Sequence, residues 1–254
     1  MKKLFLAWQE PKSRHWFTIG QLTFDGKNYQ FVYTQGVKKA QAESSFRLLH
    51  SFPDRDRIYT SSELFPLFSN RLLRSSRPDY QDYIQWLNIP QNEADPIAIL
   101  ARSGGLKATD TFEVFPDPEK SIKGVYDLHF FVRGLRYMPK YSIEKVKELQ
   151  PKECLYLTFD FQNPYSSTAL LLRTEQRHNL GYCPRYLSED ICRFSCQNPK
   201  SVRIRVEKIN PVPTPIQFRL LCSMTAQWNN DFVLFSSKDY QPIIDSSLLS
   251  KYTS

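Results

Sequence analysis

Tyrosine and arginine side chains recur in short polar segments between residues 136 and 185. Tyr137, Tyr165 and Tyr182 offer flat rings on which nucleic-acid bases can stack, and Arg136 precedes the first of them. A guanidinium group is planar and carries five donors in a fixed fork, which suits it to phosphate better than lysine. Single strands of nucleic acid are held by such aromatic platforms beside phosphate donors. These residues are therefore candidates for binding a single strand.

A second basic element lies further along the chain. The run Val202-Arg203-Ile204-Arg205-Val206 alternates, so that Arg203 and Arg205 share one face of a predicted strand, and Lys200 and Lys208 flank it. Two interpretations are open for this pair. The arginines line a groove that binds nucleic acid, or they are outward charges of the kind that keep an edge strand from pairing with another chain.

The sequence contains no motif that indicates catalysis. It has no Walker-type phosphate loop, no nucleophile elbow and no His-Glu-x-x-His pattern. The best metal candidate is Cys192 and Cys196 with Cys183 and His178 upstream, which lacks the two ligand pairs typical of structural zinc. We therefore expect a binding protein that is not an enzyme and has no catalytic residue, cofactor or metal.

Composition and charge favour a folded protein with an affinity for polyanions. The 254 residues are 41% hydrophobic and 14% aromatic, unlike disordered chains. Residues 1–120 hold 16 Lys/Arg against 14 Asp/Glu, whereas residues 121–254 hold 18 against 12. The second half thus carries a surplus of +6, which attracts nucleic acid without deciding the fold.

Three observations bear on the compartment. No run approaches the roughly 18 apolar residues that a membrane-spanning helix needs. The segment Met1 to Trp8 is too short for a signal peptide, and the five cysteines do not have the even spacing of a disulfide scaffold. We expect a cytoplasmic protein with reduced thiols and no membrane partner.

The hydrophobic periodicity predicts an α+β, β-rich protein with a small N-terminal sheet plus helices. The expected strands of this module are residues 3–8, 17–24 and 28–33, with a turn at Asp25-Gly26, and the expected helices are residues 62–73, 78–87 and 96–102. Residues 112–123 are rich in Pro and charge and indicate a connector. We therefore expect modules at 1–120 and 121–235 and a flexible tail at 236–254.

The second module is expected to be built mainly of strands. The expected strands are residues 126–135, 154–161, 169–174 and 201–209, with helices at 142–149 and 187–194. Within it, a series of segments occurs in a fixed order: Gly134-Leu135-Arg136-Tyr137, then Phe159-Asp160-Phe161-Gln162-Asn163-Pro164-Tyr165, then Ala169-Leu170, then Leu180-Gly181-Tyr182 and Pro184-Arg185. This series resembles the HIRAN domain over residues of about 125–230.

The resemblance implies an OB-like β-barrel that binds single-stranded DNA, in the best-understood members at a 3′ end. The family occurs as the N-terminal module of some DNA-remodelling helicases and as a free-standing bacterial protein. It places Arg136 on the terminal nucleotide and Asn163 beside it, and Arg185 ends the Gly-Tyr-x-Pro-Arg segment. Where the family has Asp and then Asn after the Asn-Pro-Tyr segment, this chain has Ser166 and Thr168. Because that Asp is the residue that accepts a hydrogen bond from a free 3′ hydroxyl, Ser166 puts 3′-end selectivity in question.

Residues 4–73 resemble the small N-terminal subdomain of HipA-type toxin kinases. The matching segments are Leu6-Ala7-Trp8, Ile19-Gly20-Gln21-Leu22, Tyr29-Gln30-Phe31-Val32-Tyr33 and residues 64–73. In that family the subdomain packs on the kinase core, and a free-standing version can act as an antitoxin. This resemblance implies contact with a protein and does not imply phosphoryl transfer, since no kinase catalytic loop is present.

The sequence thus predicts a nucleic-acid-binding protein that engages single-stranded or 3′-ended DNA, with an N-terminal module that docks a protein such as a DNA-processing enzyme. The alternative is a toxin–antitoxin role, as the antitoxin or regulatory partner of a HipA-like Ser/Thr kinase. The predicted nucleic-acid-binding residues are Arg136, Tyr137, Asn163, Tyr165, Ser166, Tyr182, Arg185, Arg203 and Arg205.

Overall fold

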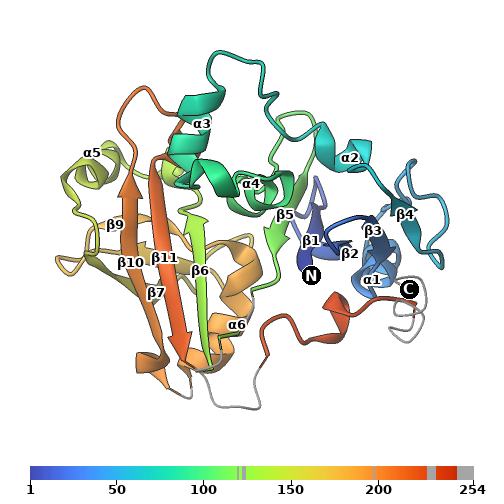
Figure 1. Cartoon of the computed structure of the whole chain (residues 1–254). Helices are drawn as coiled ribbons and strands as arrows, with labels where there is room; N and C mark the ends of the chain where they lie inside the picture. Colours follow the sequence, from blue (N-terminus) through green and yellow to red (C-terminus); the bar gives the residue numbers. More distant parts are fainter. Residues whose placement is uncertain (119, 122–123, 197, 228–232, 245–254) are drawn as a thin grey trace. The chain divides into compact units, whose positions relative to one another are not determined.

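The computed structural model describes residues 1–118, 120–121, 124–196, 198–227 and 233–244 (Figure 1). The chain divides into two compact units. Unit 1 comprises Met1–Arg77, Ala94–Asp117 and the described residues from Phe235 on, and unit 2 comprises Pro78–Glu93 and Pro118–Leu234. Each unit has its own antiparallel sheet with helices beside it, which confirms the predicted α+β, β-rich class.

Unit 1 contains a five-stranded sheet in the order β4-β3-β2-β1-β5. Its strands are β1 (Lys2–Gln9), β2 (Trp16–Phe24), β3 (Tyr29–Tyr33), β4 (Tyr59–Ser61) and β5 (Phe112–Pro116). The turn between β2 and β3 forms because Asp25 Oδ1 accepts hydrogen bonds from the amides of Lys27 at 2.8 Å and Asn28 at 2.7 Å, while Gly26 takes a φ of 103°. The predicted hairpin is therefore confirmed.

The aromatic face of β3 supplies the centre of the unit 1 core. Phe31 and Tyr33 are fully buried, and Phe31 stacks on Phe52 with ring centroids 4.0 Å apart. The Tyr33 hydroxyl donates to the carbonyl of Phe52 at 2.8 Å and accepts from the amide of Leu49 at 2.8 Å. Both hydrogen bonds satisfy a buried polar atom and fix the segment after α1 (Gly36–Glu43) over the sheet.

The helices of unit 1 agree only in part with the periodicity. Helix α4 (Pro96–Ser103) is confirmed, with Asp95 capping its N-terminus and Gly104 ending it in the left-handed conformation. The expected helix over residues 62–73 is wrong, because only the single turn α2 (Pro66–Ser69) forms there. Proline has no amide hydrogen to donate to a preceding turn, so Pro66 starts a helix and cannot continue one from Ser62.

Two segments at the ends of unit 1 differ from the expected connector and tail. Within residues 112–123, Phe112–Pro116 is strand β5, which pairs with β1 and buries Val114 and Phe115. Of residues 236–254, those up to 244 are described and belong to unit 1, and 245–254 lie outside the described residues. The short 3-10 helix η5 (Lys238–Tyr240) places the Tyr240 ring 5.2 Å from that of Phe5.

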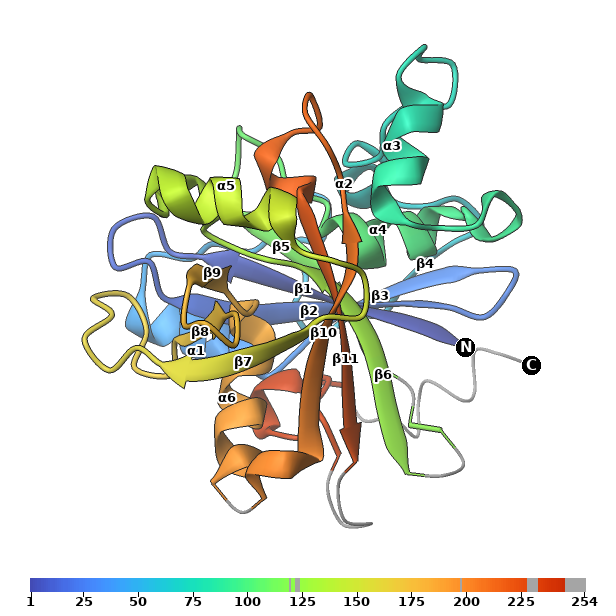
Figure 2. The same cartoon turned by 90° about the vertical axis from the view of Figure 1, so that its left-hand side faces the viewer.

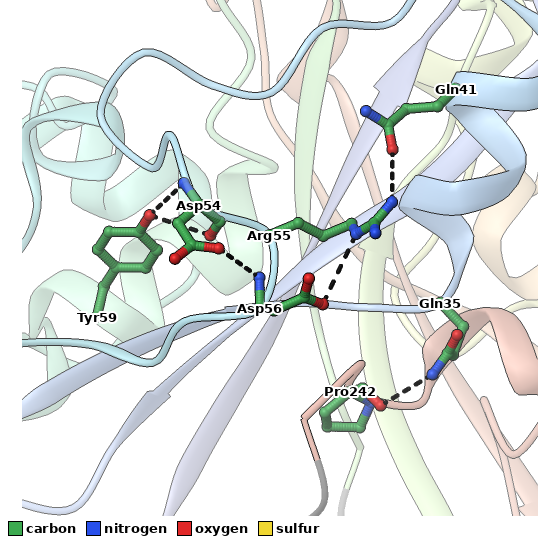
Figure 3. A network of polar contacts seen from close by, with 7 residues as sticks. All are labelled: Gln35, Gln41, Asp54, Arg55, Asp56, Tyr59 and Pro242. Atoms are coloured by element: carbon green, nitrogen blue, oxygen red, sulfur yellow. Dashed lines mark hydrogen bonds and ion pairs between the residues drawn. The ribbon is translucent and has the colours of Figure 1, made fainter.

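Polar contacts hold the edge of unit 1 around α1 (Figure 3). Gln35 Nε2 donates to the carbonyl of Pro242 at 3.5 Å, and the Gln35 amide donates to the carbonyl of Gln241 at 2.8 Å. Arg55 donates to Gln41 Oε1 at 3.3 Å, and the Tyr59 hydroxyl accepts from the amide of Asp54 at 2.7 Å. The C-terminal segment is thus tied to the N-terminal end of α1 at Gln35, and the loop before β4 to its C-terminal half at Gln41.

Unit 2 contains a six-stranded sheet in the order β6-β11-β10-β7-β8-β9 (Figure 2). Its strands are β6 (Val125–Phe131), β7 (Cys154–Phe159), β8 (Leu170–Arg173), β9 (Asn179–Tyr182), β10 (Val202–Ile209) and β11 (Leu220–Gln227). The helices are α3 (Tyr80–Leu87), α5 (Lys140–Glu148) and α6 (Arg185–Ser195), and the shorter 3-10 helices are η1 (Gln91–Glu93), η2 (Leu135–Tyr137), η3 (Pro199–Ser201) and η4 (Ile216–Phe218). Strands β6, β7, β8 and β10 and all three α-helices match the predicted segments.

The unit 2 sheet closes on itself. Arg133, just after β6, and Tyr182, at the end of β9, exchange two backbone hydrogen bonds of 2.8 Å. Since β6 and β9 are the two ends of the strand order, this bridge joins them and makes the sheet a barrel. Its interior is filled by buried apolar side chains, among them Leu128, Phe130, Leu155, Ile204 and Met224. The barrel that the sequence resemblance implies is therefore present.

Helix α3 belongs to unit 2 although it precedes β5 in the sequence. Its Tyr83 ring lies 5.8 Å from that of Phe218, and Asn210 Nδ2 donates to the carbonyls of Trp86 at 2.9 Å and Phe218 at 2.6 Å. The two units therefore do not follow a single cut in the sequence near residue 120. In the described parts of both units, every helix is too short or too polar to cross a bilayer.

Candidate nucleic-acid interface

Arg136 and Tyr137 lie in the turn that follows β6. Gly134 begins the turn with a φ of 70°, and Leu135 inserts into the core at 2% exposure. Their neighbours face solvent: Tyr137 is 78% exposed and Arg136 is exposed. Among the described residues, the Arg136 guanidinium makes no hydrogen bond or ion pair. The buried Leu135 thus fixes a turn that presents an aromatic ring and an uncompensated positive charge together.

Two glycines bring this turn against Tyr182. A Cβ atom at Gly134 would lie 3.1 Å from Tyr182 Cδ2, and a Cβ at Gly181 would lie 2.6 Å from the Arg133 carbonyl oxygen. Gly181 also has a φ of 129°, which side chains rarely adopt. Both glycines are therefore needed for the close approach of η2 to β9. The structure places Arg136, Tyr137 and Tyr182 on adjoining segments.

A shared carboxylate organises the loop between β7 and β8. Asp160 Oδ2 accepts hydrogen bonds from the Tyr182 hydroxyl at 2.8 Å and from Asn163 Nδ2 at 3.0 Å. Asn163 Oδ1 in turn accepts from the amide of Tyr165 at 3.1 Å. Burial is the main cause that raises the pKa of Tyr182 above its ordinary value, and the Asp160 carboxylate raises it further. Tyr182 therefore stays protonated as a donor at neutral pH.

The remaining predicted loop residues join the same cluster. Arg185, at the start of α6, donates from Nη2 to the Tyr165 carbonyl at 2.6 Å, and the Tyr165 ring is 57% exposed. Ser166 is half-buried, with its hydroxyl 3.3 Å from that of Thr168. Arg185 and Asn163 thus hold the loop, whereas Tyr165 is free to contact a ligand.

Sequence reasoning did not assign three residues that the structure places in this cluster. Asp160 is the central acceptor described above, and the rings of Phe159 and Phe161 flank it. These rings stack on each other with centroids 5.3 Å apart and planes 12° apart, at 37% and 80% exposure. The sequence does carry a signal for these three residues. Two phenylalanines flank a polar residue there, next to a segment of turn-forming residues. We call Arg136, Tyr137, Phe159, Phe161, Tyr165 and Tyr182 the loop surface.

Arg203 and Arg205 lie elsewhere in unit 2, on β10. Both are exposed, whereas Ile204 and Val206 between and after them are buried, which confirms the predicted alternation. Within the described part of the chain, no hydrogen bond or ion pair joins either arginine to the loop surface. The structure therefore brings seven of the nine predicted residues together and leaves these two apart.

Three of the five cysteines, Cys183, Cys192 and Cys222, are fully or partly shielded from solvent. In the described residues there is no group of three or more His, Cys, Asp and Glu side chains that could hold a metal. Burial raises the pKa of the Cys183 and Cys222 thiols well above the ordinary value, and it raises that of Cys192 to about 11. These three residues therefore remain protonated thiols at neutral pH, which are weak nucleophiles and weak ligands.

One family model and two solved structures show similarity to part of this chain. Residues 125–226 match the HIRAN domain family. Two crystal structures show a limited likeness, each with a TM-score of 0.29 over 41% of this chain. One is a protein from Lactobacillus plantarum, 18% identical and covered over 97% of its length. The other is the HIRAN domain of human HLTF, 20% identical and covered over 74%.

No curated protein matches the chain. The resemblance of residues 4–73 to the HipA subdomain stays a prediction, since the family match begins at residue 125. That match spans the strands β6 to β11, whose closure by the Arg133–Tyr182 bridge gives the barrel described above. Residues 125–226 of this chain are thus a HIRAN domain, as the order of its motifs predicted.

Proposed function

We propose that this protein binds single-stranded DNA or DNA ends through the loop surface of its HIRAN domain, without catalysis. The observation that carries the proposal is the exposure of four aromatic rings, those of Tyr137, Phe159, Phe161 and Tyr165, beside the unpaired guanidinium of Arg136. Single exposed apolar side chains are common, but exposed apolar side chains that gather in one area often mark a binding site. Bases of any sequence can stack on them, at about 1–3 kcal/mol per base.

The loop surface is rigid enough to bind without a large ordering cost. The Asp160 carboxylate joins the loop to β9, Arg185 joins it to α6, and Leu135 anchors the turn after β6. Side chains that are already held in place lose less conformational entropy when a ligand binds. Among the described residues Arg136 has no ion pair, so none has to break before its guanidinium contacts phosphate. These features favour direct binding of a flexible strand.

We expect general strand binding with reduced discrimination of free 3′ ends. Ser166 stands where the family resemblance has the carboxylate that accepts the terminal hydroxyl, and its hydroxyl lies beside that of Thr168. A neutral hydroxyl is a weaker acceptor than a carboxylate, and it does not repel a nearby phosphate. A blocked 3′ end should therefore cost less affinity than it would with Asp at this position.

The direct test measures binding of the purified protein to labelled oligonucleotides in single- and double-stranded form, with free or blocked 3′ ends, at two salt concentrations. We expect salt-sensitive binding that favours single strands. A Ser166→Asp variant should increase the preference for a free 3′ end. The absence of any binding at low salt would contradict the proposal.

A pair of variants assigns the binding to the loop surface. Arg136→Ala and Tyr137→Ala should each weaken binding by about 1–3 kcal/mol, because a phosphate contact or a stacked base is lost. Both residues are exposed, so thermal stability should not change. Arg47→Ala, at an exposed arginine of unit 1, serves as the matched control. Unchanged affinity in both variants would remove these residues from the interface.

We further propose that unit 1 docks a protein partner. The support is the resemblance of residues 4–73 to a subdomain that packs on a kinase core, together with the complete five-stranded sheet that this region forms. The partner is a DNA-processing enzyme or, in the alternative antitoxin function, a HipA-like kinase. Co-purification with a HipA-like kinase that lacks its own small subdomain would support the alternative, and DNA binding without it would favour the first.

A further inference from the structure

Strand β10, labelled in Figure 1, lies in the interior of the strand order, between β11 and β7. It carries Arg203 and Arg205. Strand β10 pairs with β11 from Val202 to Ile209 and with β7 at Ile204 and Arg205. Outward charges protect an edge strand because its backbone groups are unpaired. Since β10 is paired on both sides at Arg205, edge protection does not explain that arginine, and Arg203 lies on the same outward face one position beyond the residues paired with β7. The groove-lining interpretation therefore gains weight.

The strands beside β10 continue the same outward face. Arg205 lies opposite Cys154 on β7, and Tyr156 lies opposite Arg173 on β8. Side chains two residues apart on a strand share a face, so Cys154 and Tyr156 point outward with Arg203 and Arg205. Cys154, Tyr156, Arg203 and Arg205 are exposed, whereas the intervening Leu155 and Ile204 are buried. We call Tyr156, Arg173, Arg203 and Arg205 the strand face.

The side chains of the strand face are held in position. The Arg173 guanidinium lies over the Tyr156 ring, 5.4 Å from its centroid, and its Nε donates to Thr158 Oγ1 at 2.9 Å. An arginine stacked in this way keeps its outer nitrogens available for phosphate. An aromatic ring and an ordered guanidinium thus adjoin the two arginines of β10.

In the part of the chain that the structure describes, no carboxylate forms an ion pair with the arginines of the strand face. Strands β7 and β8 and the segment Val202–Val206 contain no Asp or Glu, and among the described residues the three arginines make no ion pair. Glu153 directly precedes Cys154 and accepts a hydrogen bond from the amide of Gln150, and Glu207 is engaged with Asn88 and His129. Asp127 lies on β6, beyond Thr225 of β11. Like charges on neighbouring positions repel one another unless an anion binds between them.

We propose that the strand face is a second nucleic-acid contact that holds the phosphate backbone of the strand bound at the loop surface. This inference rests on the proposed function, and it adds a second contact area on a different part of the barrel. Arginine forks bind phosphate without reading bases, and Tyr156 adds one aromatic platform. The resulting contact is independent of the base sequence and depends on the length of the bound oligonucleotide.

Strand β7 runs between the loop surface and the strand face. Its length therefore sets the oligonucleotide length that is needed to contact both. It leads from Cys154, opposite Arg205, to Phe159 and then to Asp160 of the loop. The five steps from Cys154 to Phe159 span about 17 Å of extended chain. A nucleic-acid strand advances about 3.4 Å per nucleotide when stacked, so about five nucleotide steps cover this distance. An oligonucleotide of four residues held at the loop surface should not reach Arg205, whereas one of sixteen should reach both areas.

The test compares dT4 and dT16 binding to the full-length protein and to an Arg203→Gln/Arg205→Gln variant over a salt series. We expect the variant to bind dT16 about tenfold more weakly and to bind dT4 within about twofold of the original protein. The slope of log K against log salt for dT16 should fall by about 1.4, since each single-strand phosphate contact contributes about 0.7. Arg203→Lys/Arg205→Lys keeps the charges and should retain most of the slope.

The control is Lys27→Gln/Arg47→Gln, which removes the same charge from exposed positions in unit 1. It should leave dT16 binding within about twofold. The inference is overturned if dT16 binding and its salt slope do not change, if dT4 binding falls equally, or if the control has the same effect. If the unaltered protein binds neither oligonucleotide at low salt, the proposed function itself fails, which is a different result.

Discussion

The Tyr182 hydroxyl donates a 2.8 Å hydrogen bond to the carboxylate of Asp160, while the Tyr182 backbone closes the barrel against Arg133. One residue therefore links the closure of the sheet to the loop that carries Phe161 and Tyr165. The same Asp160 oxygen also accepts from Asn163 Nδ2 at 3.0 Å. The position of the exposed rings depends on this contact, although Asp160 and Tyr182 are themselves half-buried.

Asp160→Asn should loosen the loop and weaken strand binding. Both donors share one oxygen of Asp160, and a neutral amide oxygen accepts from Tyr182 and Asn163 more weakly than the charged carboxylate does. We expect a loss of about 1–2 kcal/mol in the free energy of unfolding and a several-fold loss of oligonucleotide affinity. Chemical denaturation and fluorescence anisotropy measure these quantities. Asp127→Asn, at an exposed position of β6, is the matched control and should change neither.

The contact also predicts a pH dependence at high pH. Burial and then the Asp160 carboxylate raise the pKa of Tyr182 above the ordinary value of about 10 that applies in the unfolded chain. A raised pKa means that the folded state binds the proton more tightly. The stabilisation by Tyr182 is therefore fully present below pH 10 and is lost as the pH rises through the folded pKa.

Tyr182→Phe isolates this contribution. The variant should be less stable than the original protein at pH 8, by about 1 kcal/mol, because the hydrogen bond to Asp160 is lost. The difference between the two proteins should shrink as the pH rises above 10. Denaturant unfolding at pH 8, 9.5, 10.5 and 11 measures it, and a difference that stays constant or grows over this range would contradict the assigned hydrogen bond.

The order of the sequence motifs singled out Arg136, Tyr137 and Tyr182, and the structure places these residues on adjoining segments beside Gly134 and Gly181. The limits of the two units depend on pairing between distant segments. Strand β5 was missed because Pro116 and the charges after it resemble a linker, and only pairing with β1 makes Phe112–Pro116 a strand. The role of Asp160 depends on a residue 22 positions away, which no local pattern reveals. The interior position of β10 likewise follows from pairing alone.

Gly181→Ala should open the barrel. The added Cβ would lie 2.6 Å from the Arg133 carbonyl oxygen and 2.7 Å from Val132 Cγ1, at a φ of 129°. We expect a loss of more than about 2 kcal/mol in the free energy of unfolding. Gly26→Ala is the matched control, since Gly26 has a φ of 103° with no atom within 4 Å of an added Cβ. It should cost about 1 kcal/mol, and equal losses would mean that backbone strain alone accounts for the effect.

Phe161→Ala should weaken strand binding without affecting stability. The ring is 80% exposed, so little buried apolar area is lost when it is removed, and it stacks only along one side on Phe159. Loss of one stacked base predicts a fall in affinity of about tenfold. Phe161→Trp keeps the aromatic surface and should retain affinity. Equal binding by the alanine and tryptophan variants would show that this ring does not contact the strand.

Cys154 lies beside the strand face, so its reactivity can report whether an oligonucleotide covers that face without any substitution there. It is exposed and lies opposite Arg205, whereas Cys196 is exposed at the end of α6. Cys183 and Cys222 are buried, and the raised pKa of about 11 for Cys192 makes that thiol slow to react. A neutral alkylating reagent at pH 8 should therefore modify Cys154 and Cys196 first, as peptide mass spectrometry can measure.

Saturating dT16 should slow the alkylation of Cys154 several-fold while leaving the rate at Cys196 unchanged, because a strand held by Arg203 and Arg205 covers the first thiol. Saturating dT4 should protect neither cysteine, since it spans less than the distance along β7 from the loop surface to Cys154. In the Arg203→Gln/Arg205→Gln variant, dT16 should lose most of its protective effect. If dT16 binds tightly and Cys154 still reacts at its original rate, the strand leaves the loop surface in another direction.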